Sequence, residues 1–433
     1  MPRLALGVSS VALAALLVVA LLAPRSALAM PEFARRYNFS CSVCHDAFPR
    51  LNAFGESFAA MNYKLPNWRD ANTLPLGDER LALPERPPLA LRMQAYVQGR
   101  EGEDVDPLTG PTGNDSGFDF QAPYLIKLLS SSPLSENITY YFYGIFAEKG
   151  GNGEALIEDA WFRHGNLLGK GIGMQLGQFQ VSDLMFPREV RLTFQDFYAY
   201  RAAGITYDRG VLFDRAFGRI DVALGAVNGN GINANFDIDS PGYRRPDALF
   251  DNDSRKSVFG RVAFPAGRAE IGVFALDGEQ RSASGFAGAS AGARDTDKRI
   301  LGLDVRGSLP NGRAHWFAQW LRNDWDGFLD AAPQRDFDWS AGFVGLDYVR
   351  NDRWSYSVLY NYADADDFEG TGTIYEGIDM SSLTLNASYY FMRNLKTTFE
   401  VNFDLLGDRP GGPPFVGHQS KEHYLLVGFD MAL

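Results

Sequence analysis

Apolar and polar residues alternate with a period of two through much of this chain. From Leu383 to Phe391 the odd positions are apolar, whereas Thr384, Asn386 and Ser388 lie between them. The same alternation recurs in residues 314–320, 397–405 and 425–433. Because successive side chains of a strand point to opposite faces, these segments predict strands with one apolar and one polar face.

Strands of roughly ten residues account for most of the chain after residue 88. They are predicted at 89–100, 118–129, 138–147, 155–164, 171–179, 200–207, 219–227, 255–264, 268–277, 299–308, 313–322, 339–349, 353–362, 380–391, 395–404 and 422–431. A soluble sandwich alternates in the same way, so the connectors decide. From the eighth strand onward they are alternately very short (265–267, 351–352, 393–394) and long (278–298, 323–338, 363–379, 405–421). This arrangement, with an even number of about 16 strands, predicts an all-β fold, namely a transmembrane antiparallel β-barrel of the outer membrane.

The connector Gln180–Ala199 is expected to narrow the interior of this barrel. It lies between the fifth and sixth predicted strands, and in general porins the loop at that position folds into the lumen. An even number of strands also places both ends of the barrel on the periplasmic side. The residues before the first strand should therefore enter the barrel from that side or hang below it.

The first 29 residues are typical of a secretory signal peptide. Arg3 provides a positive start, residues 4–22 form an apolar run, and residues 27–29 (Ala-Leu-Ala) form a small-residue cleavage site. An uncleaved membrane anchor is the alternative, because the run approaches the length of a membrane span, but Pro24 and the cleavage pattern disfavour it. Cleavage would leave a chain that begins at Met30.

The charge balance bears on possible partners. The net charge is −12, and it would become about −14 without the signal peptide, which contains two arginines and no acidic residue. This balance argues against nucleic acid as a partner and favours attraction of cations. The rest of the chain has no long apolar run, is rich in Gly and aromatic residues, and has a mean hydropathy of −0.20. These properties fit a β-barrel rather than helical membrane spans.

Both cysteines of the chain lie in the motif Cys41-Ser42-Val43-Cys44-His45. Cys-x-x-Cys-His is the attachment signature of a c-type haem, because two thiols on one tight turn reach both vinyl groups of one porphyrin and the adjacent imidazole points at the iron. A four-cysteine zinc site is impossible here, and a redox or disulfide-bonded pair lacks a thioredoxin-like context. We therefore expect one covalent haem c, tethered by Cys41 and Cys44, with His45 as proximal iron ligand.

With this motif the chain divides into four segments: a signal peptide at 1–29, a haem c-binding segment at 30–68, a Pro-rich linker at 69–88 and a barrel at 89–433. The haem segment is rich in apolar side chains, namely Phe33, Phe39, Phe48, Leu51, Phe54 and Phe58. Because so short a segment cannot bury a haem alone, we expect it to form a small plug whose other half is the barrel wall.

The distal side of the iron has several candidate ligands. A c-type iron commonly takes Met or His as its second axial ligand. Met61 is the nearest such residue in the sequence, and we favour it. The alternatives are an open position or a histidine of the barrel region: His164, His315, His418 or His423.

Two predicted outer loops are rich in carboxylates. One contains Asp364, Asp366, Asp367, Glu369, Glu376 and Asp379, and the other contains Asp237, Asp239, Asp247, Asp251 and Asp253. Such a rim would attract divalent cations, and carboxylates suit hard metals. A solvated surface is the simpler interpretation of any single residue, and neither loop has the spacing of a calcium-binding loop.

The segment from Pro31 to Tyr63 also resembles a known family. The match rests on the lead Phe33-Ala34-Arg35, the haem motif, and the sequence Phe48-Pro49-Arg50-Leu51-Asn52-Ala53-Phe54-Gly55 that follows it. In order and spacing these are similar to the N-terminus of outer-membrane monohaem cytochrome-porin fusions, typified by iron-oxidising bacteria. The resemblance implies a single haem at or in the periplasmic mouth of a barrel. It also implies an extracellular electron donor, typically Fe(II), and a periplasmic electron carrier.

These features lead to one main hypothesis and two alternatives. The main hypothesis is a c-type cytochrome-porin in contact with outer-membrane lipid, which oxidises an extracellular donor, Fe(II), by one electron and passes the electron to a periplasmic cytochrome or other carrier. One alternative is a solute-diffusion porin in which the haem segment is a plug. The other is electron transfer in the outward direction, to an extracellular acceptor.

Overall fold

The computed structural model describes residues 32–65, 74, 77, 84–85, 87–101, 103–106, 110–114, 117–146, 156–229, 255–284, 290–310, 312–406 and 423–433. The expected signal peptide, most of the expected linker, the acidic loop from Asp237 to Asp253, and His418 lie outside these residues. Within the described ranges, no helix is both long and apolar enough to cross a membrane.

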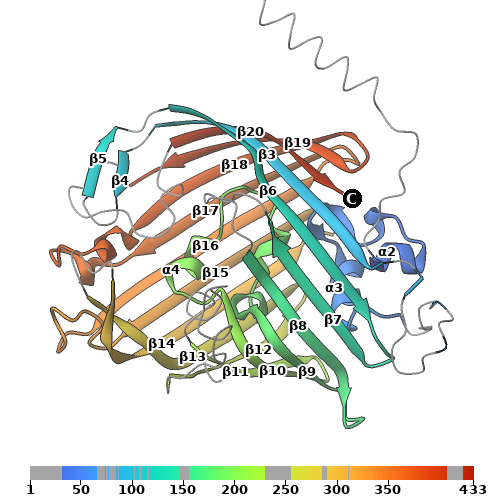
Figure 1. The fold of residues 1–433 in the computed structure, drawn as a ribbon, viewed down its shortest axis with the longest axis horizontal. Helices are drawn as coiled ribbons and strands as arrows, with labels where there is room; N and C mark the ends of the chain where they lie inside the picture. The colour runs from blue at the N-terminus through green and yellow to red at the C-terminus, as the bar shows by residue number, and fades with distance from the viewer. Residues whose placement is uncertain are drawn as a thin grey trace, which may run out of the picture.

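One closed antiparallel barrel of 16 strands dominates the molecule (Figure 1). Its strands are β3 (Leu89–Glu101), β6 (Gly117–Pro133), β7 (Ile138–Ile145), β8 (Leu156–Leu167), β9 (Ile172–Gln180), β10 (Tyr207–Phe217), β11 (Ile220–Val227), β12 (Ser257–Ala266), β13 (Ala269–Ser284), β14 (Ser290–Ser308), β15 (Ala314–Trp325), β16 (Phe337–Val349), β17 (Trp354–Asp364), β18 (Met380–Met392), β19 (Leu395–Asp404) and β20 (His423–Ala432). Strand β20 pairs with β3, with Val427 opposite Val97, and this pairing closes the barrel. The predicted fold class is confirmed, strand number included.

One predicted strand is wrong. Residues 200–207 were expected to form the sixth strand, but the helix α4 (Tyr198–Ala202) covers the first three of them and the sixth strand, β10, begins only at Tyr207. Tyr198 and Tyr200 are fully buried. The apolar residues of this stretch therefore pack inside the barrel, a role that the sequence pattern alone does not distinguish from a lipid-facing strand. A hairpin of β4 (Glu103–Asp106) and β5 (Gly110–Asn114), between β3 and β6, was not predicted either.

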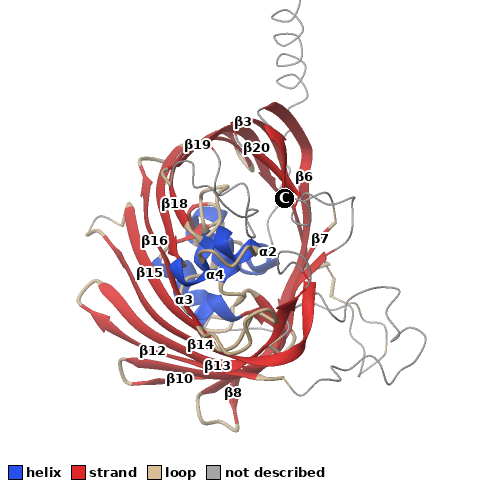
Figure 2. Ribbon diagram, turned by 90° about the vertical axis from the view of Figure 1, so that its left-hand side faces the viewer, coloured by secondary structure: helices blue, strands red, loops and turns tan. Residues whose placement is uncertain are grey.

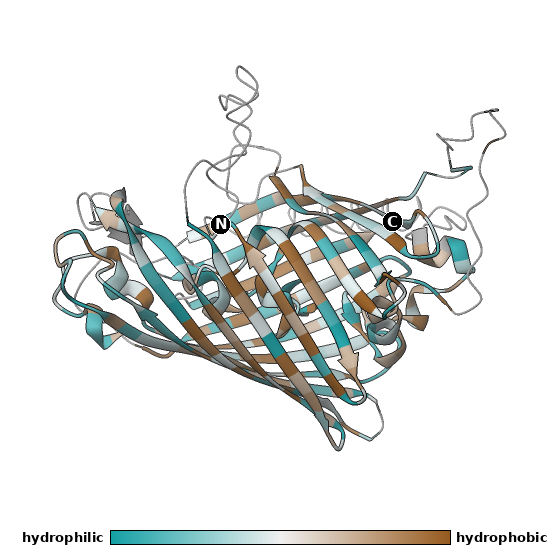
Figure 3. Ribbon diagram, turned by 90° about the horizontal axis from the view of Figure 1, so that it is seen from below, coloured by the Kyte–Doolittle hydropathy of each residue, from teal (hydrophilic) through white to brown (hydrophobic). Residues whose placement is uncertain are grey.

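Hydrophobic and hydrophilic residues alternate along strands of the barrel wall (Figure 3), and successive side chains of a strand point to opposite faces. In β15, Phe317, Gln319 and Leu321 are buried inside the barrel, whereas Trp320 on the outward face is exposed. Further exposed outward side chains are Val262, Val273, Leu301, Leu303, Val344, Leu346 and Phe429. The outward face is thus apolar, as contact with lipid requires, while the inward face carries both apolar and polar groups.

The two ends of the barrel also differ. At one end the strands are joined by short turns, such as residues 350–353 between β16 and β17 and residues 393–394 between β18 and β19. The first and last barrel strands meet at this same end, where Leu91 N donates to Leu433 O (2.9 Å). We call it the short-turn end, which in outer-membrane barrels is the periplasmic one.

The residues before the barrel form a small folded unit, which we call the N-terminal segment (residues 32–65). It contains α2 (Glu32–Tyr37), the 3₁₀ turn η1 (Cys41–Val43), the short hairpin of β1 (His45–Ala47) and β2 (Arg50–Leu51), and α3 (Ala53–Ala60). Figure 2 shows its helices within the outline of the barrel.

A second structure fills the interior, the constriction connector (residues 181–206) between β9 and β10. It contains η2 (Val181–Leu184), η3 (Arg188–Val190) and α4. Its aromatic side chains join the inward side chains of the wall in one buried core, in which Phe197 stacks on Phe343 with ring centroids 4.3 Å apart. The expectation that this connector folds into the lumen is confirmed.

Candidate functional site

The two cysteines and His45 lie on one tight turn. Val43 N donates to Ser40 O (3.0 Å) and Cys44 N donates to Cys41 O (3.2 Å), which forms η1. Both thiols are free, and Cys41 is exposed. Partial burial, together with the neighbouring Cys41, raises the pKa of the Cys44 thiol. Two thiols and one imidazole, the groups that a c-type haem uses, thus lie together on this turn.

The imidazole of His45 is oriented by the backbone. Its Nδ1 lies 3.0 Å from the carbonyl oxygen of Pro49. Because a carbonyl can only accept, Nδ1 carries the proton and the lone pair is left on Nε2, which is the atom that binds metals in this tautomer. Burial lowers the pKa of His45, which favours the neutral ring that a metal requires.

Asn52 and Gly55 hold the cysteine turn from the other side. The Asn52 amide nitrogen Nδ2 donates to Val43 O (3.0 Å), and the backbone N of Asn52 donates to Cys44 O (2.9 Å). The side-chain oxygen of Asn52 accepts from Gly55 N (2.9 Å) and so caps α3. A Cβ on Gly55 would lie 2.2 Å from Cys44 O, so only glycine allows α3 to approach this closely.

We call Pro49, Asn52 and Gly55 the turn clamp. These residues belong to the stretch that carries the family resemblance, and their contacts with the cysteine turn were not predicted. Each makes a short-range contact with the Cys41–His45 turn, through a carbonyl, an amide and a missing side chain respectively. The spacing after the haem motif therefore has a physical reason, which is to fix the geometry of the turn.

Aromatic side chains surround the turn clamp. Phe54 lies at right angles to Phe39 (ring centroids 5.8 Å apart) and is stacked with Phe58 (6.2 Å). Phe33 contacts Phe58 as well (5.7 Å). Phe54 remains partly exposed, next to a turn whose Cys41 thiol is also exposed. This leaves an apolar surface beside the thiols, as a porphyrin ring would need.

The candidate distal ligands lie in different places. Met61 follows the last residue of α3 and its side chain is 41% exposed. His315 has both ring nitrogens engaged, Nδ1 with Ser308 (2.8 Å) and Nε2 with Asp46 (2.7 Å). His164 Nδ1 accepts from Asn166 N (3.2 Å) in β8, and His423 begins β20 at the end opposite the short turns. Met61 is the candidate that belongs to the N-terminal segment itself.

The N-terminal segment rests on inward-facing residues at the short-turn end. Asp46 pairs with His315 of β15 (2.7 Å). The carbonyl of Phe48 accepts from Lys396 Nζ of β19 (2.7 Å). On the other side of the lumen, Thr139 of β7 donates to Asn62 O (3.0 Å). The segment therefore reaches across the lumen rather than along one wall.

Arg50 connects this segment to the constriction connector. Its side chain is 3% exposed, and its Nε lies 3.7 Å from the Asp347 carboxylate of β16. The guanidinium also lies over the ring of Phe186 in the connector, 5.1 Å from its centroid, and near Phe317 (5.8 Å). Phe186 and Phe317 stack on each other at 4.2 Å. The N-terminal segment, the wall and the connector thus meet at one arginine.

Charged groups fix the constriction connector in place. Arg188 forms a bidentate ion pair with Asp196 inside the connector. Although burial opposes ionisation, Arg188 and Arg191 hold the pKa of the Asp196 carboxyl well below its usual range. Glu400 on the wall is fully buried and accepts from the backbone N of Phe194 (2.6 Å) and of Gln195 (2.9 Å).

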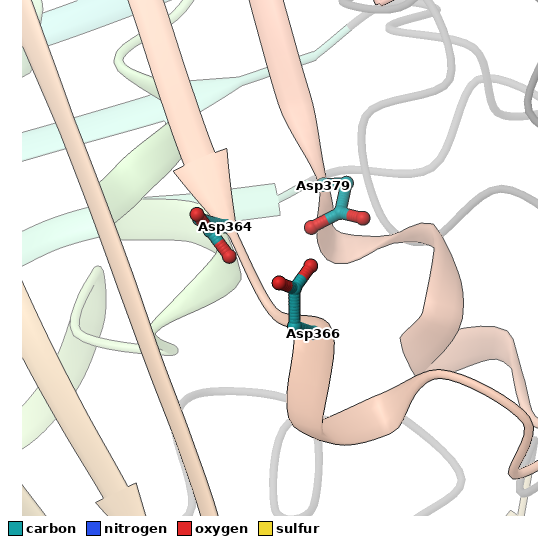
Figure 4. A group of neighbouring side chains, drawn as sticks. All are labelled: Asp364, Asp366 and Asp379. Atoms are coloured by element: carbon teal, nitrogen blue, oxygen red, sulfur yellow. The ribbon is translucent and has the colours of Figure 1, made fainter.

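A third group of residues lies in the loop between β17 and β18, which contains η6 (Asp366–Phe368) and η7 (Ile374–Ile378). Carboxylate oxygens of Asp364, Asp366 and Asp379 lie within 4.8 Å of one another (Figure 4). Oxygen ligands of this kind suit hard divalent cations. Three of the acidic residues expected at this rim are therefore brought together, whereas Asp367 is not among them and instead accepts from Asp338 N (2.8 Å).

Comparison with solved structures finds outer-membrane porins. The channel DcaP of Acinetobacter baumannii matches with a TM-score of 0.53 and 13% identity, over 80% of this chain and 96% of that chain. OmpF of Salmonella typhi, in complex with daunomycin, has a TM-score of 0.51 and 11% identity, over 80% and 97%. An anion-selective porin from Comamonas acidovorans has 0.51 and 13%, over 80% and 100%. No protein-family model matches the chain, and no curated protein matches it. The fold of this chain is that of outer-membrane porins.

Proposed function

We propose that this chain is an outer-membrane barrel that carries one c-type haem on its N-terminal segment and transfers electrons between an extracellular donor and a periplasmic carrier. The observation that supports this most is the turn clamp, because Pro49, Asn52 and Gly55 fix two free thiols and an oriented imidazole on one turn. The porin fold and the apolar outward face of the wall support a site in the outer membrane, in contact with lipid.

Haem iron, when bound, supplies one-electron chemistry whose potential depends on axial ligation and burial. In this proposal Cys41 and Cys44 hold the porphyrin by thioether bonds, and His45 binds the iron through Nε2 while Pro49 keeps Nδ1 protonated. Met61 is our proposed distal ligand. Phe39 and Phe54 would offer the porphyrin an apolar surface.

The rest of the N-terminal segment fixes the position of the site in the barrel. Asp46, Phe48 and Arg50 contact the inward wall, so the site lies at the short-turn end of the lumen. The donor we propose is Fe(II), which would be oxidised to Fe(III) as one electron passes inward to a periplasmic cytochrome or similar carrier. This choice of donor rests on the resemblance of residues 31–63 to cytochrome-porin fusions of iron-oxidising bacteria. We propose membership of that family on the same residues.

The experiment is anaerobic mixing of the purified full-length chain with Fe(II), followed by haem absorbance. We expect a haem stain that survives denaturing electrophoresis and a spectrum that becomes reduced on addition of Fe(II). Replacement of both Cys41 and Cys44 by Ser should remove the stain, whereas Ser42→Ala should keep it. A wild-type chain without the stain would refute haem attachment, and an attached haem that Fe(II) leaves oxidised would refute the proposed donor.

A second candidate function is solute diffusion through the lumen, with the N-terminal segment as a plug. The porin fold favours it, because the solved structures that this chain resembles are outer-membrane channels and porins. Conductance in planar bilayers separates the two functions, because a plugged electron conduit should pass little ion current. Outward electron transfer, the remaining alternative, predicts rapid oxidation of the reduced haem by an extracellular acceptor and no reduction by Fe(II).

A further inference from the structure

A small cavity lies inside the barrel, and one of its lining residues, Lys396, also contacts Phe48 of the N-terminal segment. It lies between the constriction connector and the wall formed by β3, β6, β19 and β20, and its volume is about 40 Å³. Six of its lining residues are charged: Arg92, Lys127, Glu189, Arg191, Lys396 and Asp430. The cavity is therefore a polar site in the narrow part of the lumen.

The charges around this cavity do not balance. Four cationic side chains face two carboxylates, although the chain as a whole has a net charge of −12. Asp430 accepts two hydrogen bonds from Arg92 (2.9 and 2.6 Å), and Glu189 accepts from Lys127 (2.7 Å). Lys396 also lies 3.7 Å from Asp430. The two carboxylates are thus shared among three of the four cations, which leaves a positive surplus at the cavity.

The surplus is buried rather than solvated. Lys127 is 5% exposed and Lys396 is 3% exposed. Two further carboxylates, Asp196 and Glu400, do not line the cavity and are already engaged. Asp196 is paired with Arg188. Glu400 is bound by four donors: Phe194 N, Gln195 N, Asn386 Nδ2 and the Tyr424 hydroxyl. Buried cations without a full complement of anions attract one from solution.

One cation presents a donor without an acceptor. Arg191 Nη1 donates to Arg188 O (2.9 Å) and lies 3.6 Å from Asp196 Oδ1, but its Nε is buried and has no hydrogen-bond partner among the described residues. Buried donors in folded proteins normally have an acceptor. An N–H of a charged guanidinium that lines a positive cavity is a donor suited to an anion.

We propose that this cavity binds a small inorganic anion of halide size. A single water needs about 10–15 Å³ of such volume, so a cavity of about 40 Å³ has room for one halide with one or two waters. The anion would neutralise the surplus positive charge beside Arg191 and Lys396. Because the cavity lies beside the constriction connector, anions should carry most of any ion current through this part of the lumen. This inference does not depend on the haem.

The test uses crystals of the full-length chain in detergent, soaked in sodium bromide and measured at the bromine absorption edge. We expect an anomalous difference peak in the cavity, within hydrogen-bond distance of Arg191 Nε. The peak should be lost in Arg191→Gln and weaker in Arg191→Lys, which keeps the charge but not the Nε–H. Arg299→Gln, an exposed arginine on the outward face, is the control and should keep the peak.

Two results would overturn the proposal. One is a wild-type crystal with no anomalous peak in the cavity. The other is a peak of unchanged height in the Arg191 variants. If Arg191→Gln does not fold, as judged by the heat-dependent shift of barrels in electrophoresis, Arg191→Lys decides the question.

Discussion

Gly55 determines how closely α3 can approach the cysteine turn. We predict that Gly55→Ala pushes the helix away, because the new Cβ would lie 2.2 Å from Cys44 O. Overpacking of this kind costs about 1–3 kcal/mol. The hydrogen bond from Asn52 N to Cys44 O should open, so hydrogen exchange at the Asn52 amide should be faster.

Gly117→Ala is the matched control for this variant. Gly117 lies in β6, and a Cβ there would meet no atom within 4 Å. Exchange at Asn52 should stay at its wild-type rate in this control. Equal exchange in both variants would show that Gly55 does not hold the turn.

At the level of single residues, the sequence indicates which side chains could bind a haem more clearly than it indicates which residues hold those side chains in place. Cys41, Cys44 and His45 are adjacent in the chain, so their joint use is visible in the motif. Pro49, Asn52 and Gly55 act through a carbonyl, an amide and the absence of a side chain. Such roles depend on how the chain folds back on itself, and only the family resemblance pointed to these positions.

Among the elements, the constriction connector depends most on one wall residue. We predict that Glu400→Gln loosens residues 194–195, because their two backbone N–H groups donate to this carboxylate. Hydrogen bonds to a charged group are worth about 1.5–3 kcal/mol, so exchange of these amides should be about 10–100 times faster. Glu369→Gln, at an exposed loop position, should leave them protected. Unchanged protection in Glu400→Gln would mean that packing alone holds the connector.

The connector should also make stability depend on pH. Burial raises the pKa of Asp183 from 3.8 to about 7. The protonated carboxyl of Asp183 therefore stabilises the folded protein. This stabilisation is fully present below the ordinary pKa of 3.8 and is lost as the pH rises through about 7.

We therefore predict that the wild-type barrel has a lower apparent melting temperature at pH 8.5 than at pH 5.5, by several degrees, since each unit of pKa shift corresponds to about 1.4 kcal/mol. Asp183→Asn should remove much of this dependence and be the more stable protein at the higher pH. Asp352→Asn, in an exposed turn, should behave like the wild type. Parallel pH curves for Asp183→Asn and the wild type would contradict this assignment.

The strands were predictable because lipid on one side and a lumen on the other impose a period of two. The sixth strand was the exception, since residues 198–205 are apolar for a different reason: Tyr198, Tyr200 and Ile205 pack inside the barrel. A pattern of apolar positions shows that side chains are buried but not which surface buries them. The same limit applies to β4 and β5, whose Gly-rich hairpin has no alternation to recognise.

In the whole molecule, the N-terminal segment and the barrel depend on contacts between residues hundreds of positions apart. Asp46 with His315 and Phe48 with Lys396 are examples, and no spacing in the sequence indicates them. From the sequence we expected only that the barrel wall would cover the other side of the N-terminal segment, without knowing which residues make the contact. The particular partners follow only from the closed barrel, which brings β15 and β19 to the same end of the lumen.

We predict that Asp347→Asn weakens this docking. Arg50 and Asp347 are both buried, and removal of one partner of a buried ion pair costs about 3–5 kcal/mol because a buried charge is left uncompensated. Release of the segment should raise the conductance of single barrels in planar bilayers above that of the wild type.

Asp338→Asn is the matched control, because Asp338 lies on the same strand but pairs with Arg322 on the exposed outward face. Exposed pairs contribute little, about 0–1 kcal/mol, so this variant should conduct like the wild type. If Asp347→Asn also keeps the wild-type conductance, the segment does not close the lumen through this pair.

The most direct test of the central claim is the intact mass of the mature chain, which is expected to begin at Met30, purified from the outer membrane of a host that matures c-type cytochromes. The account predicts the mass of the polypeptide plus one haem, and the polypeptide mass alone after both Cys41 and Cys44 are replaced by Ser. A wild-type mass equal to the bare polypeptide, or lower by the two hydrogens lost to a Cys41–Cys44 disulfide, would contradict it.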